Sequence, residues 1–451
     1  MRIPLSILDL APITRGETAS DSFAGSVALA QRAEELGYLR VWYAEHHNMA
    51  SIASSATSVL IAHVGAQTRE IRLGAGGVML PNHAPLLIAE QFGTLAAMYP
   101  GRIDLGLGRA PGSDQNTMYA LRRTPSSADT FPQDVVELQG YLSGDTRVPG
   151  VDAVPGKGSH VPLYILGSSL FGAQLAAALG LPYAFASHFA PGALDAAIAV
   201  YRREFRPSGQ LEQPYLIAGV NVIAADTESA ARERLQGIRR MRAISLYGRG
   251  RRGLGTEELT DEQADQLLAA GVGDQVDQML TYAAVGTPAQ VSDYLDGFIR
   301  QTEADELIVA HQAPNIEGRL RSVTLLAEAM QTVPTRSLSF GSFLEENRAV
   351  STTAMSLGSG RRPATGDFPA PEQLSGGGPA GRLAALRADR AACRWAGPPG
   401  RRAADGCICL KAGGTCPAGA DVPANVREYR FVSPYPAKTE VKSARSGNSA
   451  H

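Results

Sequence analysis

Cysteine is absent from this 451-residue chain until position 393, and the four that follow are Cys393, Cys407, Cys409 and Cys416. Disulfide stapling and thiol chemistry are therefore excluded from most of the chain. A strong charge of one sign is also missing, because 42 basic and 44 acidic residues give a formal net charge of −2. We therefore expect no nucleic acid and no anionic membrane surface as partner, and a small uncharged or anionic molecule as the ligand.

Long hydrophobic runs are missing as well. No run approaches the roughly 20 apolar residues that a membrane span requires. No basic segment followed by an apolar one precedes the first predicted strand, so no secretory signal is indicated. These absences predict a soluble, cytoplasmic protein.

The chain does contain a regular alternation of strand-like and helical segments, which continues to about Met330. Apolar runs typical of strands are separated by segments whose apolar residues recur every three or four positions. Eight strands are predicted, at Ile3–Leu10, Arg40–Ala44, Ile71–Met79, Arg102–Gly108, Val161–Gly167, Tyr183–Ser187, Tyr215–Ala224 and Glu306–Ala310. This pattern favours an α/β fold, a closed (β/α)8 TIM barrel, with an open doubly wound sheet as the alternative.

Two connections are longer than a barrel requires, and the composition changes near residue 333. The connections are Pro111–His160 and Ala243–Val285, and each could close over a ligand. We place the barrel at residues 1–333 and predict a low-complexity, disordered tail at residues 334–451. The cysteines in that tail lack the paired spacing of zinc ligands, so no metal site is predicted.

Titratable residues follow the second predicted strand as Glu45, His46 and His47. Such side chains at the end of a barrel strand are costly to bury without partners. Successive side chains of a strand point to opposite faces, so His46 and His47 are poorly placed to chelate one metal ion. We expect one histidine to donate or accept a proton beside an organic cofactor, with a purely structural histidine as the alternative.

Three further features lie at predicted strand ends. Gly76 and Gly77 interrupt an apolar strand, which indicates either a ligand pressed against the backbone or a tight barrel corner. Arg109 suits an anion or an ordinary salt bridge. Ser168 and Ser169 precede a helix, where they fit a phosphate site or a plain N-cap. Together these features predict a pocket for a phosphorylated planar cofactor.

With these residues in view, the chain resembles the bacterial luciferase-like flavin-dependent monooxygenases, and within them the alkanal monooxygenase-like subgroup. The resemblance runs from Met1 to about Thr335. The segments that carry it are AEHHN at Ala44–Asn48, GGVMLPNHAPLLIAEQF at Gly76–Phe92, PGRIDLGLGRAPG at Pro100–Gly112, LGSS at Leu166–Ser169 and GLPYAFASHF at Gly180–Phe189. The resemblance implies a (β/α)8 barrel that takes reduced FMN from a separate reductase and uses oxygen to oxygenate an organic substrate.

The resemblance also implies roles for single residues. His46 matches the catalytic histidine beside the flavin ring, with Glu45 and His47 on either side. Gly76 and Gly77 fall where the family holds a non-prolyl cis peptide against the flavin.

At the phosphate end, Arg109 matches a phosphate-binding arginine, while Ser168 and Ser169 match the phosphate turn. Gly172 departs from the family, which commonly has a hydroxyl residue there. Gly108 stands where luciferase has a reactive cysteine, so no light emission is implied.

The function expected from this resemblance is a two-component FMN-dependent monooxygenase acting on a small apolar compound, such as an aldehyde or a secondary metabolite. The expected partners are a flavin reductase and a second copy in a homodimer. The alternatives are a deazaflavin (F420)-dependent oxidoreductase and a non-catalytic flavin-binding subunit. Phe189, Tyr215 and Asn221 are candidates for the pocket wall, and Ala243–Val285 for a mobile cover.

Overall fold

The computed structural model describes residues 3–110, 114–249 and 259–330. The predicted tail at residues 334–451, with all four cysteines, lies outside the described residues. Parts of both long connections, residues 111–113 and 250–258, lie outside them too.

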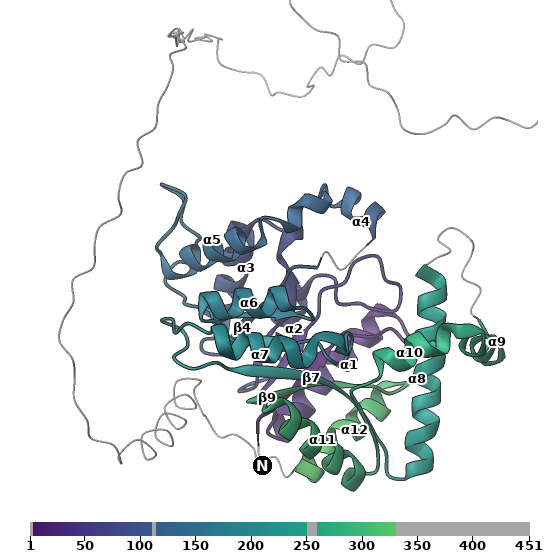
Figure 1. The fold of residues 1–451 in the computed structure, drawn as a ribbon. Helices are drawn as coiled ribbons and strands as arrows, with labels where there is room; N and C mark the ends of the chain where they lie inside the picture. The colour runs from purple at the N-terminus through teal and green to yellow at the C-terminus, as the bar shows by residue number, and fades with distance from the viewer. Residues whose placement is uncertain (1–2, 111–113, 250–258, 331–451) are drawn as a thin grey trace, which may run out of the picture. The chain divides into compact units, whose positions relative to one another are not determined.

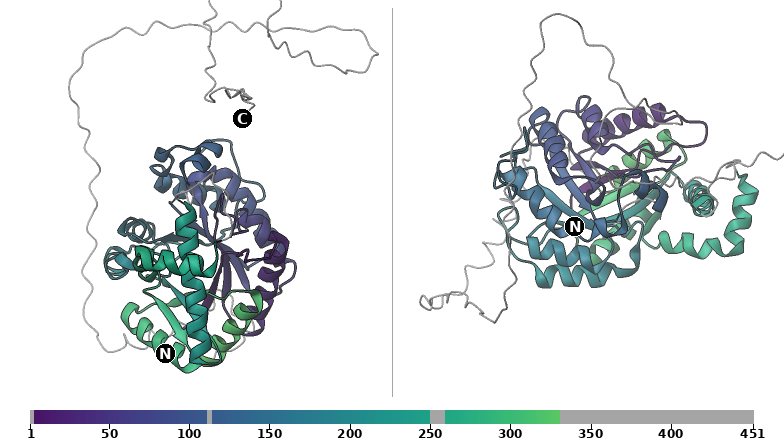
Figure 2. Two further views of the ribbon diagram at one scale, coloured as in Figure 1. Left: turned by 90° about the vertical axis from the view of Figure 1, so that its right-hand side faces the viewer. Right: turned by 90° about the horizontal axis from the view of Figure 1, so that it is seen from above.

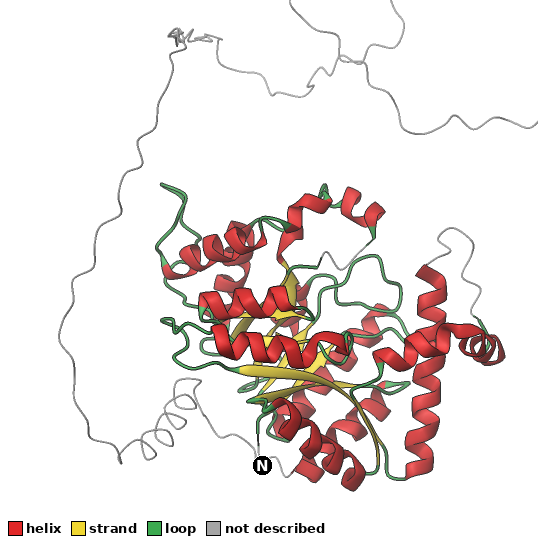
Figure 3. Cartoon of the chain, viewed as in Figure 1, coloured by secondary structure: helices red, strands yellow, loops and turns green. Residues whose placement is uncertain are grey.

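Nine parallel strands form the centre of the described part, and eight of them close into a barrel (Figures 1 and 3). Neighbouring strands pair in the order β1 to β6, and the ring is closed by β6 with β7, β7 with β9 and β9 with β1. The predicted TIM barrel is therefore confirmed. The strands are β1 (Leu5–Asp9), β2 (Arg40–Tyr43), β3 (Arg72–Met79), β4 (Ile103–Gly108), β5 (Leu163–Gly167), β6 (Tyr183–Phe185), β7 (Leu216–Ala224), β8 (Ala283–Gly286) and β9 (Glu306–His311).

Helices surround the strands, as two further views show (Figure 2). None of the helices in the described ranges is long and apolar enough to span a bilayer. The helices are α1 (Ala19–Glu35), α2 (Thr57–Gly65), α3 (Pro85–Met98), α4 (Gln115–Ala120), α5 (Phe131–Ser143), α6 (Leu170–Leu179), α7 (Leu194–Glu204), α8 (Glu228–Arg249), α9 (Asp261–Leu267), α10 (Gly273–Met279), α11 (Pro288–Thr302) and α12 (Ile316–Met330).

The ninth strand, β8, corrects the predicted connection Ala243–Val285. That connection holds the end of α8, then α9 and α10, and finally most of β8. β8 pairs only with the last part of β7, Asn221–Ala224, so it extends the sheet without entering the ring. Its sequence, Ala-Ala-Val-Gly, gives too weak an apolar signal to predict a strand. The role of this connection as a cover stays a prediction.

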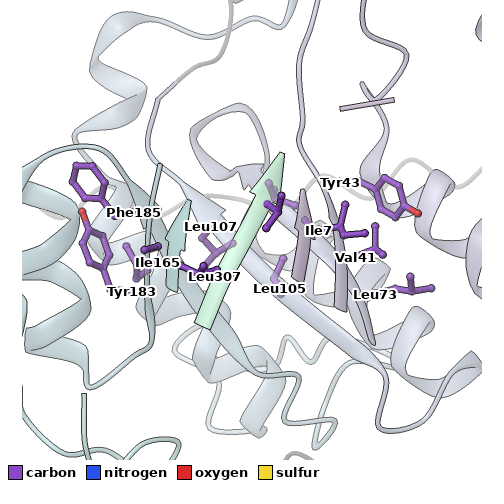
Figure 4. Packing of buried hydrophobic residues seen from close by; sticks show 14 of the residues in the cluster. Ile7, Val41, Tyr43, Leu73, Leu105, Leu107, Ile165, Tyr183, Phe185 and Leu307 are labelled. Carbon is purple, nitrogen blue, oxygen red and sulfur yellow. The ribbon is translucent and has the colours of Figure 1, made fainter. Parts of the chain in front are cut away.

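Side chains alternate between the two faces of the barrel strands. Ile7, Val41, Leu73 and Leu105 belong to the large hydrophobic cluster that strands share with helices (Figure 4). Their sequence neighbours Leu8 and Trp42 point to the other side and form a second cluster with Tyr164, Ile217 and Ile308 inside the barrel. This alternation tells which later residues of each strand face the barrel axis.

A buried layer of charged and polar residues fills the amino-terminal end of the barrel. Arg40 lies 2.8 Å from Asp104 and 3.0 Å from Glu306, and all three side chains are fully buried. The Tyr215 hydroxyl donates to Glu306 at 2.8 Å. The expectation that Tyr215 lines the ligand pocket is therefore wrong, because it precedes β7 and belongs to this layer at the opposite end from the predicted site.

Candidate active site

Glu45 joins two histidines and one backbone amide where β2 and β3 end. Its Oε1 atom accepts hydrogen bonds from Nε2 of His47 at 2.7 Å and of His83 at 2.8 Å. Its Oε2 atom accepts from the Met79 amide at 3.0 Å. Burial opposes ionisation of Glu45, but these hydrogen bonds outweigh it and hold the pKa of the carboxyl below its usual value. Glu45 is thus an ionised acceptor that orients both imidazoles.

His83 is a member of this cluster that the sequence pattern does not reveal. It follows a short 3-10 turn at Leu80–Asn82, directly after β3. The polar run Leu80–His83 is visible in the sequence, but its link to Glu45 depends on the pairing of β2 with β3, in which Tyr43 lies opposite Ala75. A contact across 38 positions carries no local sequence signal.

The same three residues are the ones that could hold a metal ion among those the structure describes. One donor atom from each of Glu45, His47 and His83 lies within 4.8 Å of the others. However, Nε2 of His47 and Nε2 of His83 already lie within hydrogen-bond distance of the same Glu45 oxygen. One N–H from each ring accounts for this geometry, so we assign two hydrogen bonds to it.

His46 occupies the other side of this chain segment and faces the barrel axis. It continues the inward series of Trp42 and Ala44, and its backbone amide donates to the Ser54 carbonyl at 3.0 Å. Its charge also influences His188, which follows β6. The structure thus separates the three predicted residues, with His46 towards the axis and Glu45 and His47 beside His83.

The glycines of β3 and β4 bring two backbones into close contact. The Gly76–Gly77 peptide bond is cis. A Cβ atom on Gly77 would lie 2.7 Å from the Gly106 carbonyl oxygen, and one on Gly106 would lie 2.3 Å from the Ala75 carbonyl oxygen. A Cβ on Gly108 would meet nothing nearer than 3.8 Å. Packing therefore requires glycine at 77 and 106, whereas at Gly108 the backbone borders open space.

Arg109 and the start of α6 lie side by side. The guanidinium carbon of Arg109 is 4.2 Å from the centre of the Phe171 ring, in the first turn of that helix. Arg109 is exposed, and its Nε atom donates to the Ala128 carbonyl at 3.3 Å. Ser169 occupies the N-cap position, yet its side chain makes no capping hydrogen bond. Ser169 is thus the N-cap residue without a side-chain cap, and the cation of Arg109 beside this helix start fits an anion.

Tyr183 explains why position 172 carries no side chain. A Cβ atom on Gly172 would lie 3.2 Å from the Tyr183 ring carbon Cε2. The Tyr183 hydroxyl donates to the Ser169 carbonyl at 3.1 Å, so it supports the serine turn from beneath. The ring thus occupies the room that a hydroxyl residue at this position would use.

Comparison of the sequence with known proteins identifies relatives of this chain. Residues 3–306 match the family described as luciferase-like monooxygenase. A luciferase-like monooxygenase of Escherichia coli K12 is 48% identical over 330 residues, which are 73% of this chain and 97% of the relative. The N-acetyl-S-alkylcysteine monooxygenase of Bacillus subtilis is 33% identical over 344 residues, which cover 73% of this chain and 98% of that enzyme.

Solved structures agree with the sequence matches. The crystal structure of apo-MsnO8 has a TM-score of 0.65 at 34% identity and covers 74% of this chain and 100% of its own. Two structures below 25% identity share the fold alone. One is the oxygenating constituent of 3,6-diketocamphane monooxygenase in complex with FMN, with a TM-score of 0.56 at 17% identity over 73% of this chain and 97% of its own. The other is an F420-dependent secondary alcohol dehydrogenase with an F420-acetone adduct, with a TM-score of 0.54 at 16% identity over 73% of this chain and 99% of its own.

Proposed function

Since this chain belongs to the luciferase-like monooxygenase family, we propose that it is the oxygenating component of a two-component system. A separate flavin reductase supplies reduced FMN, and the protein uses it with O2 to oxygenate a small, largely apolar organic substrate. The observation that carries this proposal is the contact between Arg109 and the uncapped start of α6. That contact lies at the same end of the barrel as His46 and the Glu45 cluster.

The residues at this end fit a flavin mononucleotide. Arg109 and the amides that follow Ser168 and Ser169 supply charge and N–H donors for a phosphate. Gly108 leaves backbone accessible for a flat ring, and the Gly76–Gly77 peptide lies on the neighbouring strand β3, where Gly77 packs against Gly106. Reduced flavin, when bound, supplies the electrons that activate oxygen.

The protein's own side chains then transfer a proton and hold the reacting groups in position. His46, facing the axis, gives or takes the proton during oxygenation. Glu45 keeps His47 and His83 in one tautomer, with Nε2 protonated and Nδ1 directed away from the carboxylate. Glu45 and His47 therefore act on the reaction by fixing the chain segments on either side of His46.

The phosphate assignment is tested by flavin titration with the full chain. We expect Arg109→Gln to weaken FMN binding about tenfold to a hundredfold, the loss of a charged hydrogen bond or two. Arg203→Gln is the matched control, because Arg203 is an exposed arginine that pairs with Glu204 on α7. Equal FMN affinity in the Arg109 variant and the control would contradict the assignment.

The choice of chemistry is tested by oxygen uptake. With enzymatically reduced FMN and substrate, we expect uptake that His46→Ala abolishes without releasing flavin. A deazaflavin-dependent oxidoreductase, for which the F420-binding barrel gives the same fold, would turn over without oxygen. An unchanged rate in the His46 variant would instead favour a non-catalytic flavin-binding subunit.

Two further predictions concern the whole protein. A homodimer is expected, and light scattering of the full chain during size exclusion measures it. The cytoplasmic location is likewise a prediction, which fractionation of cells that produce the protein can check.

A further inference from the structure

Arg242 is an arginine without a carboxylate partner among the residues the structure describes. Its neighbours on α8 are paired in the ordinary way, with Arg239 at 2.8 Å from Asp277 and Arg240 at 2.6 Å from Asp265. Arg242 instead donates to neutral oxygens, the Asn221 side-chain oxygen at 3.2 Å and the Met279 carbonyl at 3.4 Å. Burial lowers its pKa to about 10. A part-buried cation with no counter-charge is costly unless an anion joins it.

The guanidinium of Arg242 reaches the end of the barrel where the candidate active site lies. Along β7, Ile217 faces the barrel interior, so Gly219 and Asn221 face it too. Asn221 lies opposite Ala310 of β9, and its side-chain oxygen also accepts from Gln312 at 3.3 Å. Because Arg242 donates to the same oxygen, its charge is held over the carboxyl end of β7 and β9.

His188 supplies a second unsatisfied group at the same place. Its carbonyl accepts from the Asn221 side chain at 2.7 Å, and its Nδ1 atom would lie 2.3 Å from a Cβ on Gly219. This Nδ1 is buried and has no hydrogen-bond partner in the described part of the chain. Burial, then the charges of Arg242 and His46, lower the pKa of His188 to about 4. The ring is therefore neutral at pH 7, and both Arg242 and His46 influence it.

We propose that Arg242 and His188, both hydrogen-bonded to Asn221, form a subsite for a carboxylate group on the organic substrate. The subsite is separate from the phosphate end at Arg109, and its assignment to the substrate rests on the function proposed above. A carboxylate matches a guanidinium in charge and geometry, and it would offset the cost of burying a cation whose partners in the described ranges are neutral oxygens. A substrate anchored here would lie at the same end of the barrel as His46, which follows β2.

The test is equilibrium binding to the full chain by isothermal titration calorimetry, with hexanoate as probe and hexanamide as its neutral counterpart. We expect hexanoate to bind at least about tenfold more tightly than hexanamide, and Arg242→Gln to remove the difference. Arg239→Gln is the matched control, because it removes an arginine of the same helix that is already paired with Asp277. Loss of the preference in both variants, or in neither, would overturn the proposal.

Two further titrations distinguish a substrate subsite from a general anion site and from a cofactor site. Inorganic phosphate titrated into FMN-loaded protein, in which the Arg109 site is filled, shows whether the subsite takes any anion, and binding as tight as that of hexanoate would overturn the substrate assignment. FMN added first should leave hexanoate binding unchanged, whereas competition would mean that Arg242 holds the cofactor. Because none of these readouts requires turnover, failure of oxygen uptake would overturn the proposed function and leave the hexanoate result interpretable.

Thermal unfolding provides the remaining check. Replacing an arginine with a structural role lowers the stability of the protein, whereas replacing an arginine that serves to bind an anion does not lower the stability of the ligand-free protein. We expect the melting temperature of Arg242→Gln without ligand to equal or exceed that of the wild type. A clear decrease, together with unchanged hexanoate binding, would make Arg242 a structural residue and refute the subsite.

Discussion

Among single residues, Glu45 holds together most of the candidate site. Two imidazoles and the Met79 amide depend on its two oxygens. A carboxylate can accept from all three at once, whereas an amide offers only one acceptor oxygen. Replacement by glutamine is therefore close to isosteric but changes the hydrogen-bond pattern of the whole cluster.

We expect Glu45→Gln to lower kcat for oxygenation about a hundredfold, the order of loss when a catalytic wall shifts by about 1 Å. FMN affinity should stay within about threefold, because the phosphate contacts lie on other strands. Steady-state oxygen uptake and flavin titration measure the two effects. The exposed Glu70→Gln serves as control, and a variant that loses flavin while keeping kcat would refute the positioning role.

Sequence patterns can place some of these residues but not their partners. Glu45 and His46 stand out because charged groups follow an apolar strand, and Arg109 stands out for the same reason. His83, His188 and Arg242 do not, because each gains its role from contacts with residues far along the chain. Their signals are a polar run, a serine-histidine pair after β6 and one arginine among several on α8, and none of these distinguishes a site from a surface.

Among the elements, the β3–β4 pair is tightly constrained. We expect Gly106→Ala to lower the free energy of unfolding by about 1–3 kcal/mol or more, because its Cβ would lie 2.3 Å from a backbone oxygen of β3. Gly108→Ala, two residues along the same strand, should leave stability nearly unchanged, since its Cβ would meet nothing nearer than 3.8 Å. Urea denaturation of both variants tests this. Equal stability of the two would show that β3 and β4 can separate at no cost.

The strands themselves are largely predictable, and the exceptions have physical causes. All eight barrel strands contain apolar runs, because a parallel strand is covered on both faces. β8 escapes prediction because it has four small residues and one neighbour. Tyr215 is misplaced because its polar partner, Glu306, lies 91 positions away. A sequence pattern shows that a residue is interior, but not at which end of the barrel it lies.

For the whole molecule, the buried charged layer at the amino-terminal end is a separate determinant of stability. Replacing Arg40 by Met would leave Asp104 and Glu306 buried with too little positive charge nearby. We expect a loss of about 3–5 kcal/mol in the free energy of unfolding, the usual effect of breaking a buried ion pair. Arg40→Lys keeps the charge but lacks the several N–H donors of the guanidinium, so we expect an intermediate loss of stability. Denaturant titration measures both, and an unaffected Met variant would contradict this role.

The acid side of the stability profile depends on buried neutral histidines on two faces of the barrel. Burial, followed by the charge of Arg319, lowers the pKa of His311 to about 3, and burial lowers that of His188 to about 4. The Nδ1 atom of His311 lies 2.9 Å from the Ser322 hydroxyl on α12. Below the unfolded value of about 6.5, the unfolded chain takes up protons that the folded chain does not. Stability must therefore rise with pH between about 4 and 6.5 and level off above that range.

We expect His311→Gln to reduce this pH dependence by up to about 1.4 kcal/mol per pH unit, the contribution of one proton. The slope should not vanish, because His188 still contributes with the same sign. Urea denaturation at a series of pH values from about 4.5 to 8, which spans the unfolded pKa, measures the slope. His63→Gln is the control because His63 is an exposed imidazole on α2.

If the His311 variant kept the full slope of the wild type, as the control should, the folded chain would have to protonate His311 readily. The His311 ring packs edge-on against Tyr38 with the centroids 6.3 Å apart. It also lies against Ser322 of α12, so a protonated ring could not stay in these surroundings without reaching water. That outcome would therefore mean that α12 separates from the barrel in acid before the protein unfolds.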